Sequence, residues 1–574
     1  MSRDVEETKG GGRSPAEGSL LGAILPYLLL SLVSLLVYWQ IPELGFMSGW
    51  DDELYLVNRP EVRDWWGASW YHRLLTPELG YPVPIPTLLH YLTRQVPPSQ
   101  AVLTGHLLNL AFHLLNVGLV YRLACRWLER SRPAVAVALL WATHPLLVET
   151  VAWLTNLKGL MLAFFSFGAF LAWERAMDEP ASYRWRVATV VCFLGALGCR
   201  PEAVVIGPFF VLRTWTTTAT TLHHRRNWIP LSIIGGLSLV YLPVSIVGQF
   251  TRIAEETIGP ADTLSLGERI ANMGAALTIQ LRHVFFPFGL QPSYLPDYPG
   301  RIRDAWIGLG LGVSLVVATV AVGRKLPRTI PGWGLWWLFY LPASGVVYLP
   351  RFTADTYMYI PLAGLLLVGV PLVRSFIDDR PRVVSLSVAA AAGVLLVFWG
   401  GIAHVQTLRW RNPLTLWKPV LERYPDHPKA KWMVAGTYVD AGAYAKAAAI
   451  YRRSYTQLAG QGRLSLKAAI AFEKTGAYRD AALVAVDILS YPGKKNPHAE
   501  QFLVRIVSQH DIFFEPGRKP YKKLIEAAEK LVGGNSASEL EGGLCRRAAS
   551  YFERLGQDRL ASMLEQCARG AAPP

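Results

Sequence analysis

Residues 19–40 read SLLGAILPYLLLSLVSLLVYWQ, an apolar stretch long enough to cross a bilayer. The stretch has no small-residue cleavage site, so we interpret it as a retained membrane anchor rather than a signal peptide. Residues 46–60 follow as FMSGWDDELYLVNRP, with the adjacent carboxylates Asp51 and Asp52 and a third acid, Glu53. Because carboxylates are costly to bury near a bilayer, this acidic loop indicates a reaction centre rather than a packing element.

The composition is that of a membrane protein. Hydrophobic residues make up 52% of the 574 residues and charged residues only 17%. The net charge of +15 is spread between the apolar stretches, as cytoplasmic loops require, so no nucleic-acid partner is expected. The five cysteines form no CxxC pair, so neither a zinc site nor a redox motif is predicted.

The apolar stretches predict an all-α polytopic membrane protein of about eleven transmembrane helices, in a domain over residues 19–404 behind a cytoplasmic tail at 1–18. The predicted spans are roughly 19–40, 101–123, 133–149, 158–174, 185–199, 201–213, 228–249, 304–322, 333–350, 357–374 and 383–404.

Arginine-rich loops set the predicted orientation. With the N-terminus in the cytoplasm, the loops at 122–132, 175–186, 213–226, 324–328 and 374–382 are all cytoplasmic, as the positive-inside rule requires. Two long outer loops are then expected at about 41–100 and 250–303. The unusual polar residues collect on this outer side, which predicts an extracytoplasmic site.

A helical repeat domain is predicted over residues 405–574, on the same outer side. Alanine-rich amphipathic helices replace the apolar runs there, and a pattern recurs at a period of 34 residues. Its members are Gly442, Tyr444 and Ala447, which recur as Gly476, Tyr478 and Ala481. This period is typical of tetratricopeptide helix pairs.

The last two predicted helices, about 538–554 and 557–569, form a hairpin that turns near Leu555 and Gly556. Cys545 and Cys567 lie at similar distances from that turn. In an oxidising compartment a disulfide between them is one interpretation, and two small buried residues are the alternative.

Asp51 and Asp52 are the candidate catalytic residues. Transfer of a group to a hydroxyl needs a base that takes the hydroxyl proton, and a carboxylate at the mouth of an apolar cavity suits that task. Two adjacent acids also suit a divalent cation, although no metal or other cofactor is expected here. A solvated turn or helix cap is the structural alternative.

The remaining pocket candidates are polar residues at the outer ends of the spans. His106 and Asn109 begin a polar stripe that continues through His113 and Asn116, for which hydrogen bonding between helices is the alternative. His144 and Glu149 end one span and Lys158 begins the next.

Arginines at two further outer junctions are candidates for binding a donor phosphate. Arg200 precedes Glu202, and Arg351 precedes Asp355. Arginine is the side chain best shaped for phosphate, so Arg200 and Arg351, with Lys158, are the predicted phosphate-binding residues. Mutual salt bridges, such as Arg200 with Glu202, are the competing interpretation.

Several motifs in order resemble those of the membrane O-mannosyltransferases that carry tetratricopeptide repeats, and their bacterial relatives. They are WDDELYLVNRPEV (50–62), YPVP (81–84), HLLNLAFH (106–113), HPLLVETVAW (144–153) and LPASGVVYLPRFTADTYMYIPLAG (341–364). This family belongs to the C-type glycosyltransferase superfamily. The resemblance implies that Asp51 and Asp52 are catalytic, that transfer from a polyprenyl-phosphate sugar is inverting and metal-independent, and that the C-terminal domain binds an acceptor protein. Relatives tend to have Lys-Glu in place of 200–202 and Ala-Glu-Arg in place of 354–356.

We therefore expect a glycosyltransferase of the bacterial inner membrane that moves a sugar from a polyprenyl-phosphate donor to a hydroxyl, on a protein or a glycan. A membrane-anchored repeat scaffold without catalytic activity is the alternative from a different class. A transporter is a third interpretation, but no inverted repeat or pair of broken helices supports it.

Overall fold

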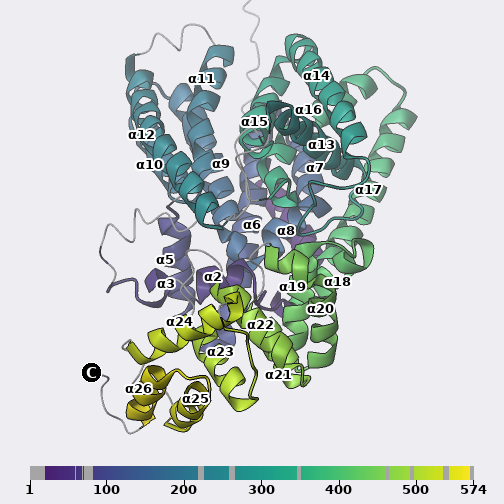
Figure 1. The fold of residues 1–574 in the computed structure, drawn as a ribbon. Helices are drawn as coiled ribbons and strands as arrows, with labels where there is room; N and C mark the ends of the chain where they lie inside the picture. Colours follow the sequence, from purple (N-terminus) through teal and green to yellow (C-terminus); the bar gives the residue numbers. More distant parts are fainter. Residues whose placement is uncertain are drawn as a thin grey trace, which may run out of the picture.

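The computed structural model describes residues 20–57, 60–67, 69, 82–217, 225–256, 265–345, 351–460, 465–490, 497–516, 518–533 and 542–568. Throughout these residues the secondary structure is helical, without a β-strand (Figure 1). The all-α prediction is confirmed for this part of the chain.

A bundle of helices makes up the first two thirds of the chain. Its members are α1 (Leu20–Val37), α2 (Asp51–Leu56), α3 (Pro60–Arg63), α5 (Pro84–Thr93), α6 (Pro98–Leu128), α7 (Ser131–Ala142), α8 (Val148–Ala152), α9 (Leu157–Asp178), α10 (Arg184–Leu197), α11 (Ile206–Thr217), α12 (Arg225–Glu256), α13 (Leu266–Phe285), α14 (Arg301–Lys325), α15 (Ile330–Tyr340), α16 (Tyr359–Ile377) and α17 (Arg382–Leu408).

Six helical stretches are long and apolar enough to cross a membrane, and a seventh is reached if α7 and α8, bent by 56°, count as one span. Each of the eleven predicted spans overlaps a helix in the described residues, but α7, α10, α11 and α15 are short. The structure therefore supports an integral membrane protein with six to seven candidate spans in the described residues, and the count of eleven stays a prediction.

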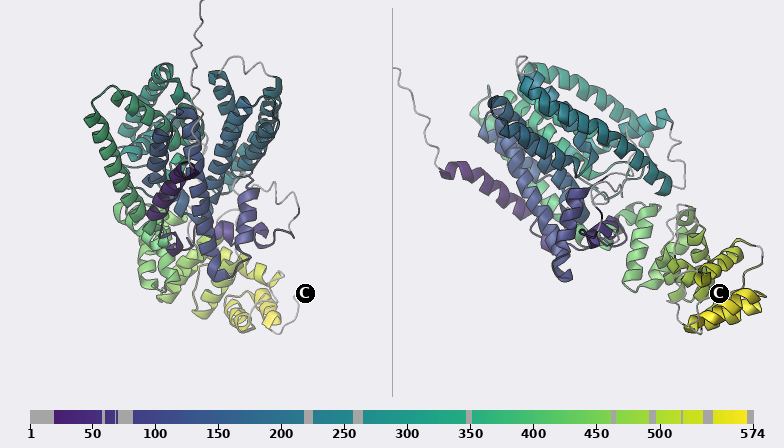
Figure 2. Two further views of the ribbon diagram at one scale, coloured as in Figure 1. Left: turned by 180° about the vertical axis from the view of Figure 1, so that it is seen from behind. Right: turned by 90° about the vertical axis from the view of Figure 1, so that its left-hand side faces the viewer.

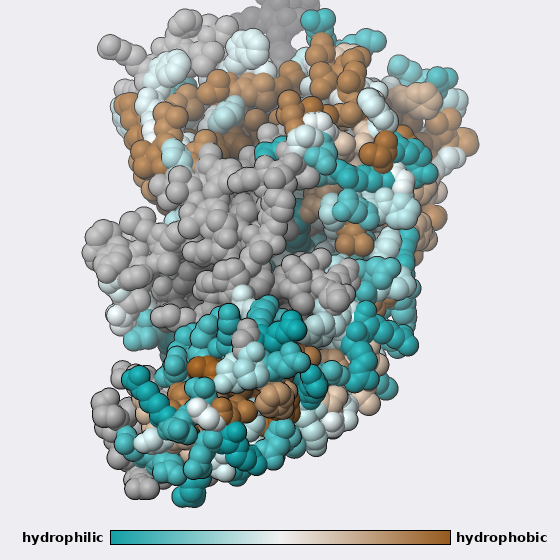
Figure 3. All heavy atoms as spheres, viewed as in Figure 1, coloured by the Kyte–Doolittle hydropathy of each residue, from teal (hydrophilic) through white to brown (hydrophobic). Residues whose placement is uncertain are grey.

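The surface of the bundle fits this interpretation. Figure 3 shows apolar residues over the bundle helices at the top of the view and hydrophilic residues over the C-terminal helices below. Large apolar side chains are exposed on α12, α14 and α17, among them Leu239 (75%), Val317 (62%) and Val397 (79%). Lipid rather than water is the solvent in which such side chains are stable on a helix surface.

The predicted outer loop at 250–303 contains a full helix, α13, which packs against α14. The two helices approach closely because both carry glycines at the contact. A Cβ on Gly308 would lie 1.8 Å from the backbone oxygen of Gly274, and a Cβ on Gly274 would lie 2.3 Å from that of Ala305. Small residues allow this approach between helices in a membrane.

Gly308→Val is therefore expected to destabilise the protein by at least about 1–3 kcal/mol, the usual cost of overpacking. Gly310→Ala on the same helix is the control, because a Cβ there meets nothing within 4 Å. The control should be neutral or stabilising by about 0.5–1 kcal/mol. Thermal unfolding of the purified protein measures both, and equal melting temperatures for the two variants would contradict the close α13–α14 contact.

The C-terminal helices form four packed pairs after a linking helix, α18 (Pro413–Arg423). The pairs are α19 (Pro428–Asp440) with α20 (Tyr444–Gly460), α21 (Leu466–Lys474) with α22 (Tyr478–Leu489), α23 (Pro497–Gln509) with α24 (Lys519–Gly533), and α25 (Gly542–Arg554) with α26 (Asp558–Ala568). Figure 2 shows from two further sides that these pairs lie at one end of the bundle.

Glycines with a positive φ angle lie in the turns of three of these pairs. Gly442 (φ 72°), Gly476 (φ 78°) and Gly556 (φ 68°) each end the first helix of a pair in the left-handed region, which glycine enters without steric cost. The predicted turn at Leu555 and Gly556 is present. The tetratricopeptide assignment stays a prediction, and the side chain of Cys567 lies outside the described part of the chain, so the pairing with Cys545 is not tested.

The hydrophobic core does not stop at the predicted boundary between 404 and 405. Residue 404 lies within α17, and the core of the bundle continues through Trp417 of α18 to Met433 of α19. A second core begins at Ala435 and runs through the helix pairs. The C-terminal helices are thus packed onto the bundle rather than tethered to it.

Candidate active site

The acidic loop lies between the bundle and the C-terminal helices, where α2 begins at Asp51 (Figure 1). Two backbone contacts hold the turn: Gly49 N–H donates to Glu53 Oε2 at 2.7 Å, and Met47 N–H donates to Asp52 Oδ2 at 2.9 Å. The turn also needs a positive φ of 75° at Gly49. Acids in a first helical turn interact favourably with the helix dipole, so the sequence is suited to this conformation.

Asp52 is completely buried and serves as an acceptor for three donors. Besides Met47, Trp153 Nε1–H donates to Oδ1 at 3.1 Å and Thr155 Oγ1–H donates to the same oxygen at 2.9 Å. Burial raises the pKa of Asp52 to about 7, and the Asp51 charge adds to the rise, although the bonds from Met47 and Thr155 oppose it. This carboxyl ties the acidic loop to the α8–α9 connection.

Asp51 differs from its neighbour. It is half-buried, and among the described residues its carboxylate forms no hydrogen bond. Its charge nevertheless acts on the Arg351 guanidinium. Of the two acids, Asp51 is the one whose oxygens are available to another molecule.

An indole stack packs around Trp50 of the acidic loop. Trp50 stacks on Trp153 with ring centroids 4.4 Å apart and on Trp410 at 6.0 Å, and it meets Trp417 edge-on at 5.2 Å. The Lys429 ammonium lies 4.7 Å from the centre of the Trp50 ring. Through Trp50, the acidic loop therefore packs against both the α8–α9 connection and the first C-terminal helices.

The buried Glu149 and Arg351, whose side chain is 16% exposed, form an ion pair beside this stack. The Arg351 guanidinium donates to Glu149 Oε1 at 2.5 Å and to the Pro292 carbonyl at 3.1 Å, and it lies 5.2 Å from the Trp153 ring centre. Glu149 Oε2 accepts from Thr356 N–H at 3.3 Å. The carboxylate of Glu149 raises the pKa of Arg351 despite burial, so the guanidinium stays charged.

Arg200 and Glu202 form a second ion pair. Arg200 donates through Nη2 to Oε1 at 2.5 Å and through Nε to Oε2 at 3.2 Å. The Arg200 Nη1 atom lies 3.6 Å from the position that a Cβ on Gly159 would occupy, next to the buried Lys158. The salt bridge that the competing interpretation expected is thus present for Arg200, both arginines contact a carboxylate, and their role in phosphate binding stays a prediction.

Tyr357 connects the two ion pairs. The charges of Arg351 and Glu149, and those of Arg200 and Glu202, all act on its side chain. The Arg351 guanidinium lies 5.9 Å from its ring centre. The structure thereby brings Asp51, Asp52, Glu149, Arg351, Arg200 and Glu202 to one end of the bundle, through Trp153 and Tyr357.

The polar stripe on α6 makes contacts between helices, and its first residue reaches Gly45, just before the acidic loop. His106 Nε2 lies 3.4 Å from the Gly45 carbonyl. Asn109 donates to the carbonyls of Val151 and Trp153 at 3.2 and 2.8 Å, which supports the α8–α9 connection. The remaining two members, His113 and Asn116, bond to the Tyr359 hydroxyl at 2.9 and 3.3 Å.

His144 and Asp355 have other partners. His144 Nε2 contacts the Val284 carbonyl at 2.9 Å and its Nδ1 accepts from Leu146 N–H, so this side chain joins its helix end to α13. Asp355 accepts from the Tyr294 hydroxyl at 2.6 Å. No contact recorded among the described residues joins either side chain to Asp51. In the described part of the chain, no group of three or more His, Cys, Asp or Glu residues is arranged to hold a metal ion.

Sequence reasoning did not single out several residues that build the site. Trp153, Thr155 and Asn156 lie in the stretch 149–156, and Asn156 and Thr150 both bond to the Thr356 hydroxyl, at 2.7 and 3.0 Å. The available signal was the stretch ETVAWLTN, in which four of eight residues are polar, between two apolar helices.

The fold and this site define a polytopic all-α membrane protein with an acidic centre at one end of the bundle. A comparison with curated proteins finds three protein O-mannosyl-transferases. TMTC3 of Homo sapiens is 26% identical over 159 residues, and TMTC3 of Mus musculus 28% identical over 171 residues. F38B6.6 of Caenorhabditis elegans is 21% identical over 459 residues, or 75% of this chain.

The chain is thus distantly homologous to protein O-mannosyl-transferases, which suggests a membrane glycosyltransferase role. The matches span 17% and 18% of the two mammalian proteins and 62% of the nematode protein. No protein-family profile and no solved structure matches the chain.

Proposed function

We propose that this protein transfers a sugar from a polyprenyl-phosphate donor to a hydroxyl on an acceptor protein, at the extracytoplasmic face of a membrane. The observation that carries the proposal is the acidic pair at one end of the bundle, with Asp52 anchored and Asp51 available beside Arg351. Distant homology to protein O-mannosyl-transferases supports the reaction class.

In this proposal the two acids have different roles. Asp51 is the base that takes the proton from the acceptor hydroxyl as its oxygen attacks the anomeric carbon, and the lipid phosphate leaves. Asp52 is a positioning residue, because its oxygens are occupied by donors from the protein. Arg351, Arg200 and Lys158 supply the positive charge that the leaving phosphate requires.

The C-terminal helices contact the acidic loop directly, which supports a role in presenting the acceptor. Ser48 Oγ–H donates to Asp440 Oδ2 at 3.4 Å, and the Cβ position of Gly49 lies 3.9 Å from the Met433 sulfur. Both partners are on α19. An acceptor held by these helices would therefore lie near Asp51.

The direct test is an in vitro transfer assay with the purified full chain, polyprenyl-phosphate mannose and a mixture of extracted acceptor proteins, analysed by mass spectrometry. We expect hexose on serine or threonine of the acceptors. The same comparison on cells with and without the chain identifies natural acceptors. Binding of proteins by the C-terminal helices without any transfer, across a panel of polyprenyl-phosphate sugars, would instead establish the scaffold interpretation.

The raised pKa of Asp52 predicts a pH-dependent stability. Between its ordinary value of 3.8 and about 7, the folded protein retains a proton that the unfolded chain releases. The contribution of protonated Asp52 to the free energy of unfolding is present in full at low pH, and it is lost as the pH rises through about 7. The melting temperature of the wild type should therefore fall, relative to that of Asp52→Asn, between about pH 5 and about pH 8. A constant difference across this range would contradict the assigned burial.

A further inference from the structure

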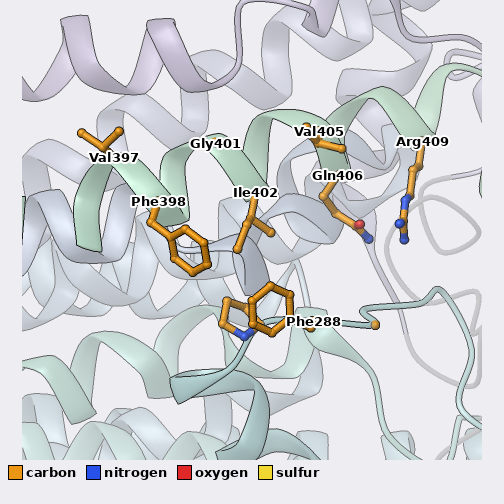
Figure 4. Close-up of a pocket in the computed structure, with 10 residues that line it drawn as sticks. Phe288, Val397, Phe398, Gly401, Ile402, Val405, Gln406 and Arg409 are labelled. Atoms are coloured by element: carbon orange, nitrogen blue, oxygen red, sulfur yellow. The ribbon is translucent and has the colours of Figure 1, made fainter. Parts of the chain in front are cut away.

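A groove of about 560 Å³ lies between α17 and the segment that follows α13, apart from the acidic loop. Figure 4 shows Phe398 and Ile402 of α17 directed toward Phe288 on the opposite side. Gln406 and Arg409 line the end of the groove nearest the C-terminus of α17. The groove is thus apolar along most of its length and basic at one end.

The apolar part opens onto surface that fits lipid. Val397 is 79% exposed, Val405 58% and Phe288 57%. They belong to, or lie beside, the candidate membrane span at Arg382–Arg411. A hydrocarbon chain from the bilayer can therefore enter the groove without crossing polar surface.

Two arginines approach the segment 289–290, in which Gly289 lines the groove. Arg409 Nη1 lies 3.5 Å from the Leu290 carbonyl. Arg423 Nη1 lies 2.5 Å from the position that a Cβ on Gly289 would occupy. No ion pair joins either guanidinium to a carboxylate among the described residues, whereas Arg200 and Arg351 are both paired.

We propose that this groove binds an anionic phospholipid of the bilayer. One acyl chain lies against Phe288, Phe398 and Ile402, and Arg409 and Arg423 hold the phosphate. Guanidinium groups bind phosphate through charge-assisted hydrogen bonds, and a lipid chain contributes the apolar contact that a free phosphate lacks. The inference does not depend on the proposed transfer reaction.

The indole stack argues against the sugar donor as the occupant. Trp410 follows Arg409 directly, and Trp410, Trp153 and Trp50 are stacked and only 2%, 3% and 6% exposed. Among the described residues, no hydrogen bond or ion pair joins Gln406 or Arg409 of the groove to Asp51 or Asp52, and the packed rings of Trp410 and Trp50 leave no opening in the stack beside Arg409. A resident lipid at Arg409 would instead stabilise the Trp410 side of the stack.

The test uses the purified full chain in detergent and two lipids with identical acyl chains, phosphatidylglycerol and phosphatidylcholine. Thermal unfolding and native mass spectrometry report the shift in melting temperature and the number of lipids bound. We expect phosphatidylglycerol to raise the melting temperature more than phosphatidylcholine, and to remain bound at one copy. Glycerol 3-phosphate, which has the phosphate without the chains, should give no shift.

Variants assign the effect to the groove. The double variant Arg409→Gln/Arg423→Gln should lose the difference between the two lipids. Gly401→Leu should weaken binding of both, because a Cβ at Gly401 meets nothing within 4 Å and the added side chain fills the groove. Lys418→Gln is the matched control, since it removes one positive charge from α18 at a side chain paired with Glu422.

Three results would overturn the proposal: equal shifts from the two lipids, an unchanged difference in the double variant, or a full shift from glycerol 3-phosphate. Displacement of phosphatidylglycerol by polyprenyl phosphate at equal concentration would also overturn it, and would assign the groove to the donor.

Discussion

Asp51→Asn is expected to lower the rate of sugar transfer by about 10²–10⁴-fold, the range that a positioned general base contributes. The amide has nearly the shape of the carboxylate but does not accept a proton. Since the Asp51 side chain makes no hydrogen bond to the described part of the protein, the substitution should leave the melting temperature almost unchanged. The measurement is initial rate against donor concentration, with melting temperature recorded on the same preparation.

Two neighbouring acids provide the controls for this prediction. Glu53→Gln should transfer sugar at close to the wild-type rate, because a glutamine oxygen still accepts from Gly49 N–H. Asp52→Asn should change stability as well as rate, because an amide has one acceptor oxygen where the carboxylate uses two. If Asp51→Asn transfers sugar at the wild-type rate while Asp52→Asn is inactive but has the wild-type melting temperature, the proposed roles of the two residues are reversed.

Arg351→Met is expected to destabilise the folded protein by about 3–5 kcal/mol, the cost of leaving one member of a buried ion pair without its partner. Glu149 is 4% exposed, and its Oε1 atom would lose the guanidinium at 2.5 Å. The substitution also removes the cation that lies 5.2 Å from the centre of the Trp153 ring. Unfolding of the purified protein by heat or denaturant measures the change.

Arg328→Met is the matched control for the buried pair. Its partner is Glu129, and the two side chains are 58% and 64% exposed, so the loss should be only about 0–1 kcal/mol. The double variant Glu149→Gln/Arg351→Met should recover part of the lost stability, because it no longer buries an unpaired carboxylate. Equal destabilisation by Arg351→Met and Arg328→Met would show that the Glu149 pair is not buried as described.

Local patterns predicted much of the helix content. Each apolar stretch proposed as a span overlaps a helix in the described residues, and the turns at Gly442 and Gly476 fall where the 34-residue period places them. The bent arrangement of α7 and α8 was not predicted. Between the two helices, at residues 143–144, the only sequence feature that indicates a bend is a histidine before a proline. The bend of 56° depends on how both helices pack.

For the candidate site, the sequence identified most of the residue types but not their partners. Arg351 is predicted to bind phosphate on the basis of its chemistry, which did not reveal that the structure pairs it with Glu149. His144 was expected in the pocket, but it bonds to the Val284 carbonyl of α13. Such pairings join residues far apart in the chain, so no periodicity within one segment reveals them.

The sequence by itself determined the class of molecule, because hydrophobicity and helical period are properties of adjacent residues and need no knowledge of the partner. It also determined that an acidic pair lies just beyond the first apolar helix. Only the tertiary structure decided that Asp52 is the anchored acid and Asp51 the available one. That distinction depends on Trp153 and Thr155, about a hundred residues away, whose donors reach Asp52 only when α2 packs against the α8–α9 connection.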